Sequence, residues 1–506
     1  MHLFQPDERP PCFDQFWQIA VGLFPELQKF PIFGPRAGVF SGTFHSRIIK
    51  VVALPPGPSL SSFVQTYRYV RNPLPLLDEC ARQFGDIFTL RLLGTHPWVF
   101  VWSPPLLKKL FTAPPEDVHA GEANASVFGP LAGDASVFTM DESAHLDRRR
   151  LLLPQFHGDR MRVYFDLIHR IASDAVARWR PGVSFAINRE TQKMTLQAII
   201  RAVFGVDTGN GQSSELVAAL TDFANNAVAS PMLLARPLQH DWGPWSPWGR
   251  IVRLKARNDA AIHREIQARR RSESAGDRED ILSLLLQVRY EDGAPLTDQQ
   301  VRDELVVMLM AGHETTGTAL SWAFERILSL PEVERRIREE LTAVVGTAAM
   351  TAAHLSQLEY LDAVIKESLR IRPIMPVGGG RLVKRALVIG GYEIPPGAIV
   401  VNAMYLLHHR PDLYPEPDEF RPERFLGKRV IDPYEWTPFG GGVRRCLGYA
   451  FALFEMKTIL ATILSAARLR IENPNAAVTR RGFFLAPKGG PSVVLSGALA
   501  KPEAGQ

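Results

Sequence analysis

The sequence predicts a mainly α-helical protein with small β-sheets (α+β), folded as one large domain. Most of the chain has apolar residues at three- and four-residue spacing, which is the period of an amphipathic helix. Segments with the character of strands are few and short. No repeat and no Gly/Ser-rich linker divides the 506 residues, which are enough for one large core.

The composition excludes several classes of protein. Hydrophobic residues make up 46% and charged residues 22%, so the chain is neither largely disordered nor a multi-spanning membrane protein. A net charge of +5 over this length is too dilute to indicate a nucleic-acid partner. The three cysteines, Cys12, Cys80 and Cys446, are far apart and predict no disulfide framework, which favours the reducing cytoplasm.

Residues 1–53 are predicted to be an N-terminal extension of a single domain at 54–506. Their apolar stretches, 16–24 and 30–40, fall short of the ~20 residues of a spanning helix. They also lack the pattern of a signal peptide. Two interpretations stay open: a loosely packed extension, or a segment lying on a membrane surface that gives peripheral contact. The proline-rich run at 54–58 predicts a stiff boundary.

The pattern along the domain predicts each element in turn. Helical spacing occurs at Leu151–Trp179, Val217–Ala229, Ile251–Arg271 and Thr297–Leu330. Strands are predicted at Ile87–Leu92, Trp98–Trp102, Leu387–Ile389, Ile399–Asn402 and Ser492–Leu495. The charged stretch Arg269–Asp280 predicts a solvated loop.

The segment Thr297–Leu330 predicts one long central helix. Thr297 and Gln300 form a capping-box pattern, and Pro331 ends the helix. Its middle reads Ala-Gly-His-Glu-Thr-Thr over 311–316. Glycine there costs about 1 kcal/mol relative to alanine, and an ionised carboxylate in an apolar helix needs partners or water. This interruption therefore predicts a functional site.

A second motif surrounds the last cysteine. Residues 439–448 follow the pattern F-x-x-G-x-R-x-C-x-G, with Phe439, Arg444, Cys446 and Gly448 at the named positions. A thiolate bound to iron needs backbone N–H groups aimed at its sulfur, and glycines allow that approach. Arginine offers a fork to an anionic group beside the metal.

The cysteine motif resembles that of the cytochromes P-450, the haem-thiolate monooxygenases. The resemblance covers roughly residues 54–500 and implies the cytochrome P-450 fold, with the long central helix over the haem. It implies haem b (iron protoporphyrin IX) as the cofactor and Cys446 as the axial metal ligand. Phe439, Arg444 and Gly448 are then cofactor-binding residues.

Other motifs agree with this resemblance. The pattern E-x-x-R at 367–370 implies a structural network in which Glu367 and Arg370 bind Arg424 of the loop at 420–425. His145 and Arg149 resemble a segment that binds a haem propionate. Arg381, after the E-x-x-R helix, resembles another propionate-binding arginine.

The central motif resembles the dioxygen-side motif of the same family. Ala311 and Gly312 are then expected to make room for dioxygen, and Glu314 and Thr315 to relay protons to it. The histidines His313, His408 and His409 are interpreted as structural residues.

Segments that set specificity in the family are mostly apolar here and predict a pocket for a large apolar substrate. Its expected lining is Val127, Phe128, Leu131, Phe138, Met232, Leu233, Leu309, Met375, Val377, Phe483 and Phe484. The resemblance is to bacterial members that oxidise fatty acids, alkanes and terpenoids. A fatty acid or terpenoid is therefore the first expectation, and a steroid or macrolide the second.

No residues are left over for a fused flavin or iron–sulfur domain, so electrons are expected from a ferredoxin or flavodoxin-type donor with its reductase. Arg148, Lys428, Arg429 and Arg445 are the predicted basic docking face, and a monomer is expected. Two alternatives stay open: a peroxide-driven or rearranging haem-thiolate enzyme, and a non-catalytic haem-binding sensor.

Overall fold

Helices account for most of the fold in the computed structural model, which describes residues 54–156, 158, 160–206, 215–228, 230–234, 239–272, 278–427 and 431–498. The predictions for residues 1–53, Lys428 and Arg429 fall outside these residues.

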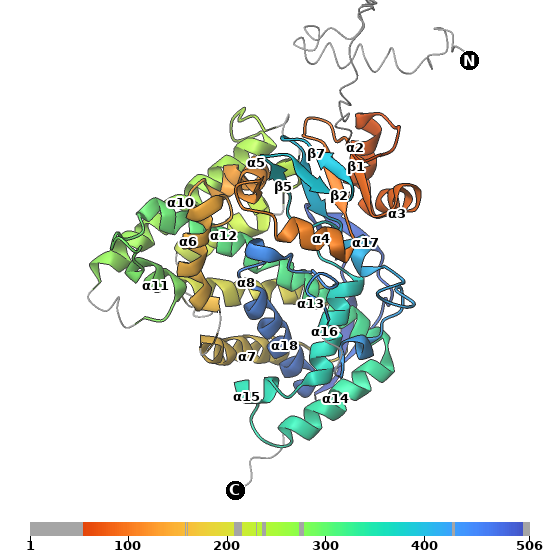
Figure 1. Cartoon of the computed structure of the whole chain (residues 1–506). Helices are drawn as coiled ribbons and strands as arrows, with labels where there is room; N and C mark the ends of the chain where they lie inside the picture. Colours follow the sequence, from red (N-terminus) through yellow and green to blue (C-terminus); the bar gives the residue numbers. More distant parts are fainter. Residues whose placement is uncertain are drawn as a thin grey trace, which may run out of the picture. The chain divides into compact units, whose positions relative to one another are not determined.

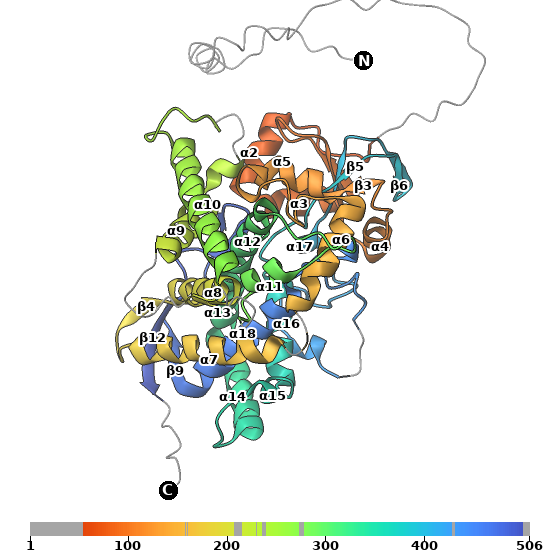
Figure 2. The same ribbon diagram turned by 90° about the vertical axis from the view of Figure 1, so that its left-hand side faces the viewer.

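The elements follow the chain from α2 to β12 (Figures 1 and 2). The helices are α2 (Ser62–Arg71), α3 (Pro73–Phe84), α4 (Pro104–Phe111), α5 (Ala120–Ala132), α6 (Glu142–Leu152), α7 (Arg160–Arg178), α8 (Ile187–Phe204), α9 (Glu215–Phe223), α10 (Pro247–Arg271), α11 (Ile281–Gln287), α12 (Asp298–Gly312), α13 (Glu314–Ser329), α14 (Pro331–Val345), α15 (Ala352–Leu355), α16 (Glu359–Ile371), α17 (Met404–His408) and α18 (Tyr449–Ala466). The strands are β1 (Ile87–Leu90), β2 (Trp98–Val101), β3 (Val118–His119), β4 (Ser184–Ala186), β5 (Arg381–Val383), β6 (Leu387–Ile389), β7 (Tyr392–Ile394), β8 (Ile399–Asn402), β9 (Ala467–Ile471), β10 (Val478–Arg481), β11 (Phe484–Pro487) and β12 (Ser492–Ala498).

The largest sheet has five strands in the order β1-β2-β8-β5-β3. β2 and β8 are parallel, with Trp98 opposite Ile399, and the other pairs are antiparallel. A second sheet has the order β4-β12-β9, and β6–β7 and β10–β11 are two-stranded. Figure 1 shows the large sheet with α2 and α3 at one end of the domain, and α7, α14 and α18 at the other.

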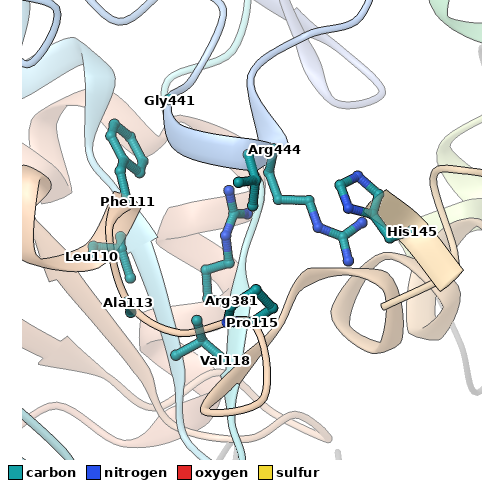
Figure 3. A pocket seen from close by; sticks show the side chains of 10 residues that line it. Leu110, Phe111, Ala113, Pro115, Val118, His145, Arg381, Gly441 and Arg444 are labelled. Carbon is teal, nitrogen blue, oxygen red and sulfur yellow. The ribbon is translucent and has the colours of Figure 1, made fainter. Parts of the chain in front are cut away.

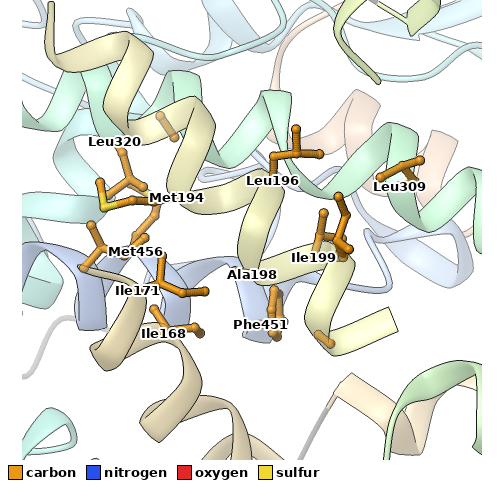
Figure 4. Packing of buried hydrophobic residues seen from close by; sticks show 14 of the residues in the cluster. Ile168, Ile171, Met194, Leu196, Ala198, Ile199, Leu309, Leu320, Phe451 and Met456 are labelled. Carbon is orange, nitrogen blue, oxygen red and sulfur yellow. The ribbon is translucent and has the colours of Figure 1, made fainter. Parts of the chain in front are cut away.

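The main core lies among the long helices. Side chains from α7, α8, α13 and α18 interleave there, including those of Ile171, Met194, Leu320 and Met456 (Figure 4). All four are less than 5% exposed, so α7, α8 and α18 form a closely packed base against α13.

The predicted strands are confirmed, and the helix at 251–271 lies within α10. The helix predicted at 151–179 is wrong as one piece, because α6 ends at Leu152 and α7 begins at Arg160. Pro154 lies in the break, and proline cannot donate the backbone hydrogen bond that a continuous helix needs. The helix predicted at 217–229 is α9, followed by a π-helical turn at Ala224–Val228.

The single long central helix is also two helices. The capping box of Thr297 and Gln300 is confirmed, but α12 ends at Gly312 and α13 begins at Glu314, with His313 between them. Side-chain donors bind carbonyl groups at this break: the Thr195 hydroxyl of α8 donates to the His313 carbonyl at 2.9 Å, and Thr315 Oγ1 donates to the Ala311 carbonyl at 2.6 Å.

The prediction of a solvated loop at 269–280 is wrong at both ends. Arg269 is 3% exposed and donates to both carboxylate oxygens of Asp280 at 2.8 Å. A buried ion pair, in which one guanidinium nitrogen donates to both carboxylate oxygens, ties the end of α10 to the start of α11, because each charge satisfies the other away from water.

Within the described part of the chain, one helix, α18, is long and apolar enough to cross a membrane by length and composition. More than half of it is buried inside the domain, as expected of a core helix.

Candidate active site

The cysteine lies in a tight loop that leads into α18. The Cys446 N–H donates to the Phe439 carbonyl at 2.9 Å and closes the loop. Gly441 and Gly442 lie against Phe111, and a β carbon at either position would overlap it. The backbone N–H of Gly448 donates to the Cys446 sulfur. The glycines of this motif therefore serve close packing and the support of the sulfur.

Cys446 is accessible to solvent, yet enough protein surrounds its thiol that burial raises its pKa. This combination fits a group that lines an internal space. The Gly448 N–H and the charges of Arg149 and Arg445 oppose the rise in the pKa. A bound cation would favour the thiolate further.

Four cationic or potentially cationic side chains gather near this loop: His145 and Arg149 of α6, Arg381 of β5, and Arg444. Figure 3 shows His145, Arg381 and Arg444 lining one pocket. Burial lowers the pKa of Arg381 and of Arg444 to about 10. Burial, followed by the charges of Arg444, Arg149 and Arg381, lowers the pKa of His145 to about 3.

This set carries more positive than negative charge. Asp141 forms an ion pair with Arg444, while the hydrogen bonds of Arg381 go to the carbonyls of Gly379 at 3.1 Å and Gly380 at 3.3 Å. Buried guanidinium groups need anionic partners, and a group with two carboxylates would supply them.

The donor set also suits a metal held mainly by a cofactor. Among the residues that the structure describes, no group of three or more His, Cys, Asp or Glu side chains could hold a metal ion. The residues present fit a haem: Cys446 would hold its metal, and the arginines would pair with its two carboxylates.

The E-x-x-R residues form a buried network. Arg370 donates to both oxygens of Glu367, at 2.6 and 2.8 Å, and both side chains are fully buried. Arg424 Nε lies 3.4 Å from Glu367 Oε1, and the Arg421 N–H donates to the same oxygen at 2.8 Å. The three residues predicted for the network are thus brought together.

Sequence reasoning missed the link from this network to the cysteine loop. Arg370 donates to the His408 carbonyl at 2.7 Å, and His408 Nε2 accepts the N–H of Thr437 at 3.0 Å. Thr437 begins the turn that leads to Phe439. Spacing alone does not distinguish His408 from His409, so the sequence held no signal for this contact.

The dioxygen-side residues differ in exposure. Ala311 and Thr315 retain accessible surface, whereas the Glu314 side chain is only 1% exposed. That Gly312 makes room for dioxygen stays a prediction; the structure gives this glycine a packing role, because a β carbon there would lie 2.7 Å from Ile199 Cδ1. The space that this glycine frees is filled by α8.

The predicted pocket residues separate into two groups. Phe128 packs against Phe483 with ring centroids 4.7 Å apart and against Phe138 at 5.5 Å, so three segments meet in one aromatic cluster. The partly exposed residues are Val127, Phe128, Phe138, Met232, Met375, Phe483 and Phe484. The prediction is wrong for Leu131, Leu233 and Leu309, which are at most 1% exposed and belong to the core; Val377 is also buried, at 8%.

The predicted docking face needs one correction. Arg148 is fully buried and donates to Glu304 of α12 at 2.7 Å, so it cannot meet a partner protein. Arg445 is half-buried, and its guanidinium lies 3.9 Å from the centre of the Tyr449 ring.

The fold is that of the cytochromes P450. The solved structure of the cyanobacterial CYP120A1 with bound retinoic acid has a TM-score of 0.76 at 25% identity and covers 88% of this chain and 100% of its own. The haem domain of cytochrome P450DA has a TM-score of 0.77 at 24% identity, with coverage of 89% and 99%.

The chain belongs to the cytochrome P450 family, whose sequence pattern it matches over residues 53–491. It is 37% identical over 423 residues to cytochrome P450 135B1 of Mycobacterium tuberculosis, covering 83% of this chain and 86% of the relative. Cytochrome P450 135A1 of the same organism is 35% identical over 440 residues, with coverage of 86% and 94%. The protein is therefore a cytochrome P450 monooxygenase, an enzyme of a haem-dependent family that uses O2 and a redox partner.

Proposed function

We propose that the protein inserts one atom of O2 into a C–H bond of a large apolar substrate, with haem b bound at Cys446. The observation that carries this proposal is the cysteine loop, in which the Gly448 N–H donates to the Cys446 sulfur beside a buried cationic cluster. Haem supplies the iron chemistry that activates O2, which a cysteine ligand favours.

The chain's own residues hold the cofactor. Cys446 provides the metal ligand, and the Gly448 N–H tunes the charge on its sulfur. Arg149, Arg381 and Arg444 bind the two propionates, because guanidinium groups pair with carboxylates in a bidentate way. His145 can donate a hydrogen bond to a propionate, and an anion there would oppose the lowering of its pKa by burial and the nearby arginines.

Glu314 and Thr315 deliver protons. The Thr315 hydroxyl is fixed by its bond to the Ala311 carbonyl and can orient a water molecule through its oxygen. Burial raises the pKa of Glu314, and a positioned carboxyl group can act as a general acid.

The substrate is a fatty acid or a terpenoid, with a steroid or macrolide as the second choice. The aromatic cluster of Phe128, Phe138 and Phe483 supports an apolar ligand. CYP120A1 is described with retinoic acid, an isoprenoid acid, and this supports the same class.

Electrons come from a ferredoxin or flavodoxin-type protein in the cytoplasm.

Peripheral membrane contact is supported by α2, which exposes Phe63 at 65% and Tyr67 at 54% while burying Gln65. This apolar face lies close in sequence to residues 1–53.

Visible spectra of the purified ferric protein, titrated with laurate, retinoic acid and a steroid, test the proposal. A low-to-high-spin shift is expected with laurate or retinoic acid. Cys446→Ser should lose the reduced carbonyl spectrum that a thiolate ligand gives. A wild-type protein that binds no haem, or a serine variant that keeps that spectrum, would contradict the proposal.

A further inference from the structure

Glu314 has a charged partner on the hairpin β10–β11, whose tip carries Phe483 of the aromatic cluster. Arg481 Nε lies 2.9 Å from Glu314 Oε1. Among the described residues, no other ion pair involves this carboxylate. Arg481 ends β10, in the hairpin β10–β11, whereas Glu314 begins α13.

The two members of this pair differ in exposure. The Glu314 side chain is 1% exposed and that of Arg481 is 42% exposed. Neither oxygen of Glu314 has an aligned hydrogen-bond donor among the described residues. Burial raises the pKa of Glu314, and the charge of Arg481 opposes this. The charge state of the carboxylate therefore depends on one guanidinium that reaches solvent.

The same hairpin contacts the aromatic cluster. Arg481 pairs in register with Phe484, and Gly482 turns the chain between them with a φ of 58°. Phe483, at this turn, packs on Phe128. A ligand that displaces the Phe483 side chain would therefore move the backbone two residues away from Arg481.

We propose that Arg481 is a positioning residue that holds Glu314 for proton transfer and links it to occupancy of the pocket through the hairpin tip. This inference rests on the proposed function. In the paired state the guanidinium favours the ionised carboxylate, which would take up a hydrated proton from the bulk solvent. Glu314 would then pass the proton to the water that Thr315 orients and become ionised again, and no bond to Arg481 forms or breaks.

His313, the ionisable residue next to Glu314, does not provide a positive charge in place of Arg481. His313 is 1% exposed, and burial lowers its pKa to about 4, with Arg481 contributing to the decrease. It is therefore neutral near pH 7, and Arg481 is the cation that faces Glu314.

The first test needs no substrate. The infrared carboxyl band of Glu314, assigned by its loss in Glu314→Gln, is titrated in wild type, Arg481→Gln and Arg481→Lys. In Arg481→Gln the midpoint should move to higher pH, while Arg481→Lys should stay closer to wild type. The control Arg470→Gln removes a 64% exposed arginine of β9 and should change nothing. An unchanged midpoint in Arg481→Gln would overturn the proposal.

The second test measures coupling, the amount of product formed per reductant consumed. The substrate is laurate or retinoic acid, whichever of the two gives the spin shift. Arg481→Gln should lower product formed per reductant about tenfold and release peroxide, with haem content and the spin shift retained. In the Glu314→Gln background the same change should add nothing. Equal losses in both backgrounds would show that Arg481 acts independently of Glu314. Failure of wild type to bind haem would instead refute the proposed function.

Discussion

In the proposed mechanism, Thr315 orients a water molecule for proton transfer, with its hydroxyl fixed by the bond to the Ala311 carbonyl. Removing its hydroxyl in Thr315→Ala leaves water beside dioxygen without an oriented partner. Product per reductant should fall at least tenfold, with the balance appearing as peroxide. Oxygen uptake, peroxide and product are measured together. Thr342→Ala is the control, because that exposed hydroxyl makes the same backbone bond, at 2.8 Å, on α14. Normal coupling in Thr315→Ala would refute the relay role.

Gly312 is expected to matter for packing. In Gly312→Ala the new methyl group would meet Ile199, which should cost about 1–3 kcal/mol of unfolding free energy, despite the better helix propensity of alanine. Ile199→Ala removes the two closest atoms, so the double variant should lose less than the sum of the single variants. Urea unfolding measures the cycle. Strictly additive losses would show that the contact does not explain this glycine.

At the scale of elements, the buried pair Glu367–Arg370 of α16 ties this helix to other segments, because Arg370 donates to the His408 carbonyl and Glu367 accepts the Arg421 N–H. Glu367→Gln leaves a buried guanidinium without its carboxylate, and the loss should be about 3–5 kcal/mol. Glu332→Gln breaks an exposed pair with Arg335 at the same spacing on α14 and should cost under ~1 kcal/mol. Thermal unfolding and haem retention measure both. Equal effects would mean that burial does not govern this network.

Elements were predictable from the sequence where local chemistry determines them. The capping box, the cysteine motif and E-x-x-R need particular residue types at fixed spacing, and the structure brings their members together. The sequence predicts Arg148 and Arg269 to be surface charges, but both are buried in ion pairs with Glu304 and Asp280. Tertiary packing brings these partners together, and the local sequence does not identify them. The break at His313 similarly depends on α8, and no local pattern contains that information.

Across the whole molecule, a polar chain connects the helical core to the cysteine loop. It runs from Arg370 through His408 to Thr437, and Asn402 of β8 donates to the Thr437 hydroxyl at 2.8 Å. Because His408 Nε2 accepts the Thr437 N–H, the imidazole must stay neutral. Burial, followed by the charge of Arg370, holds the pKa of His408 well below 6.5.

This neutral histidine should make stability depend on pH. The unfolded chain binds a proton at His408 below about pH 6.5 while the folded chain does not. Its contribution is therefore complete above pH 6.5 and declines as the pH falls, by up to about 1.4 kcal/mol per unit. His408→Gln keeps an acceptor but cannot titrate, so urea unfolding between pH 7 and pH 5 should show a shallower slope. The exposed His96 gives the control His96→Gln, whose slope should match wild type. Identical slopes in all three proteins would show that protonation of His408 does not lower the free energy of unfolding as the pH falls.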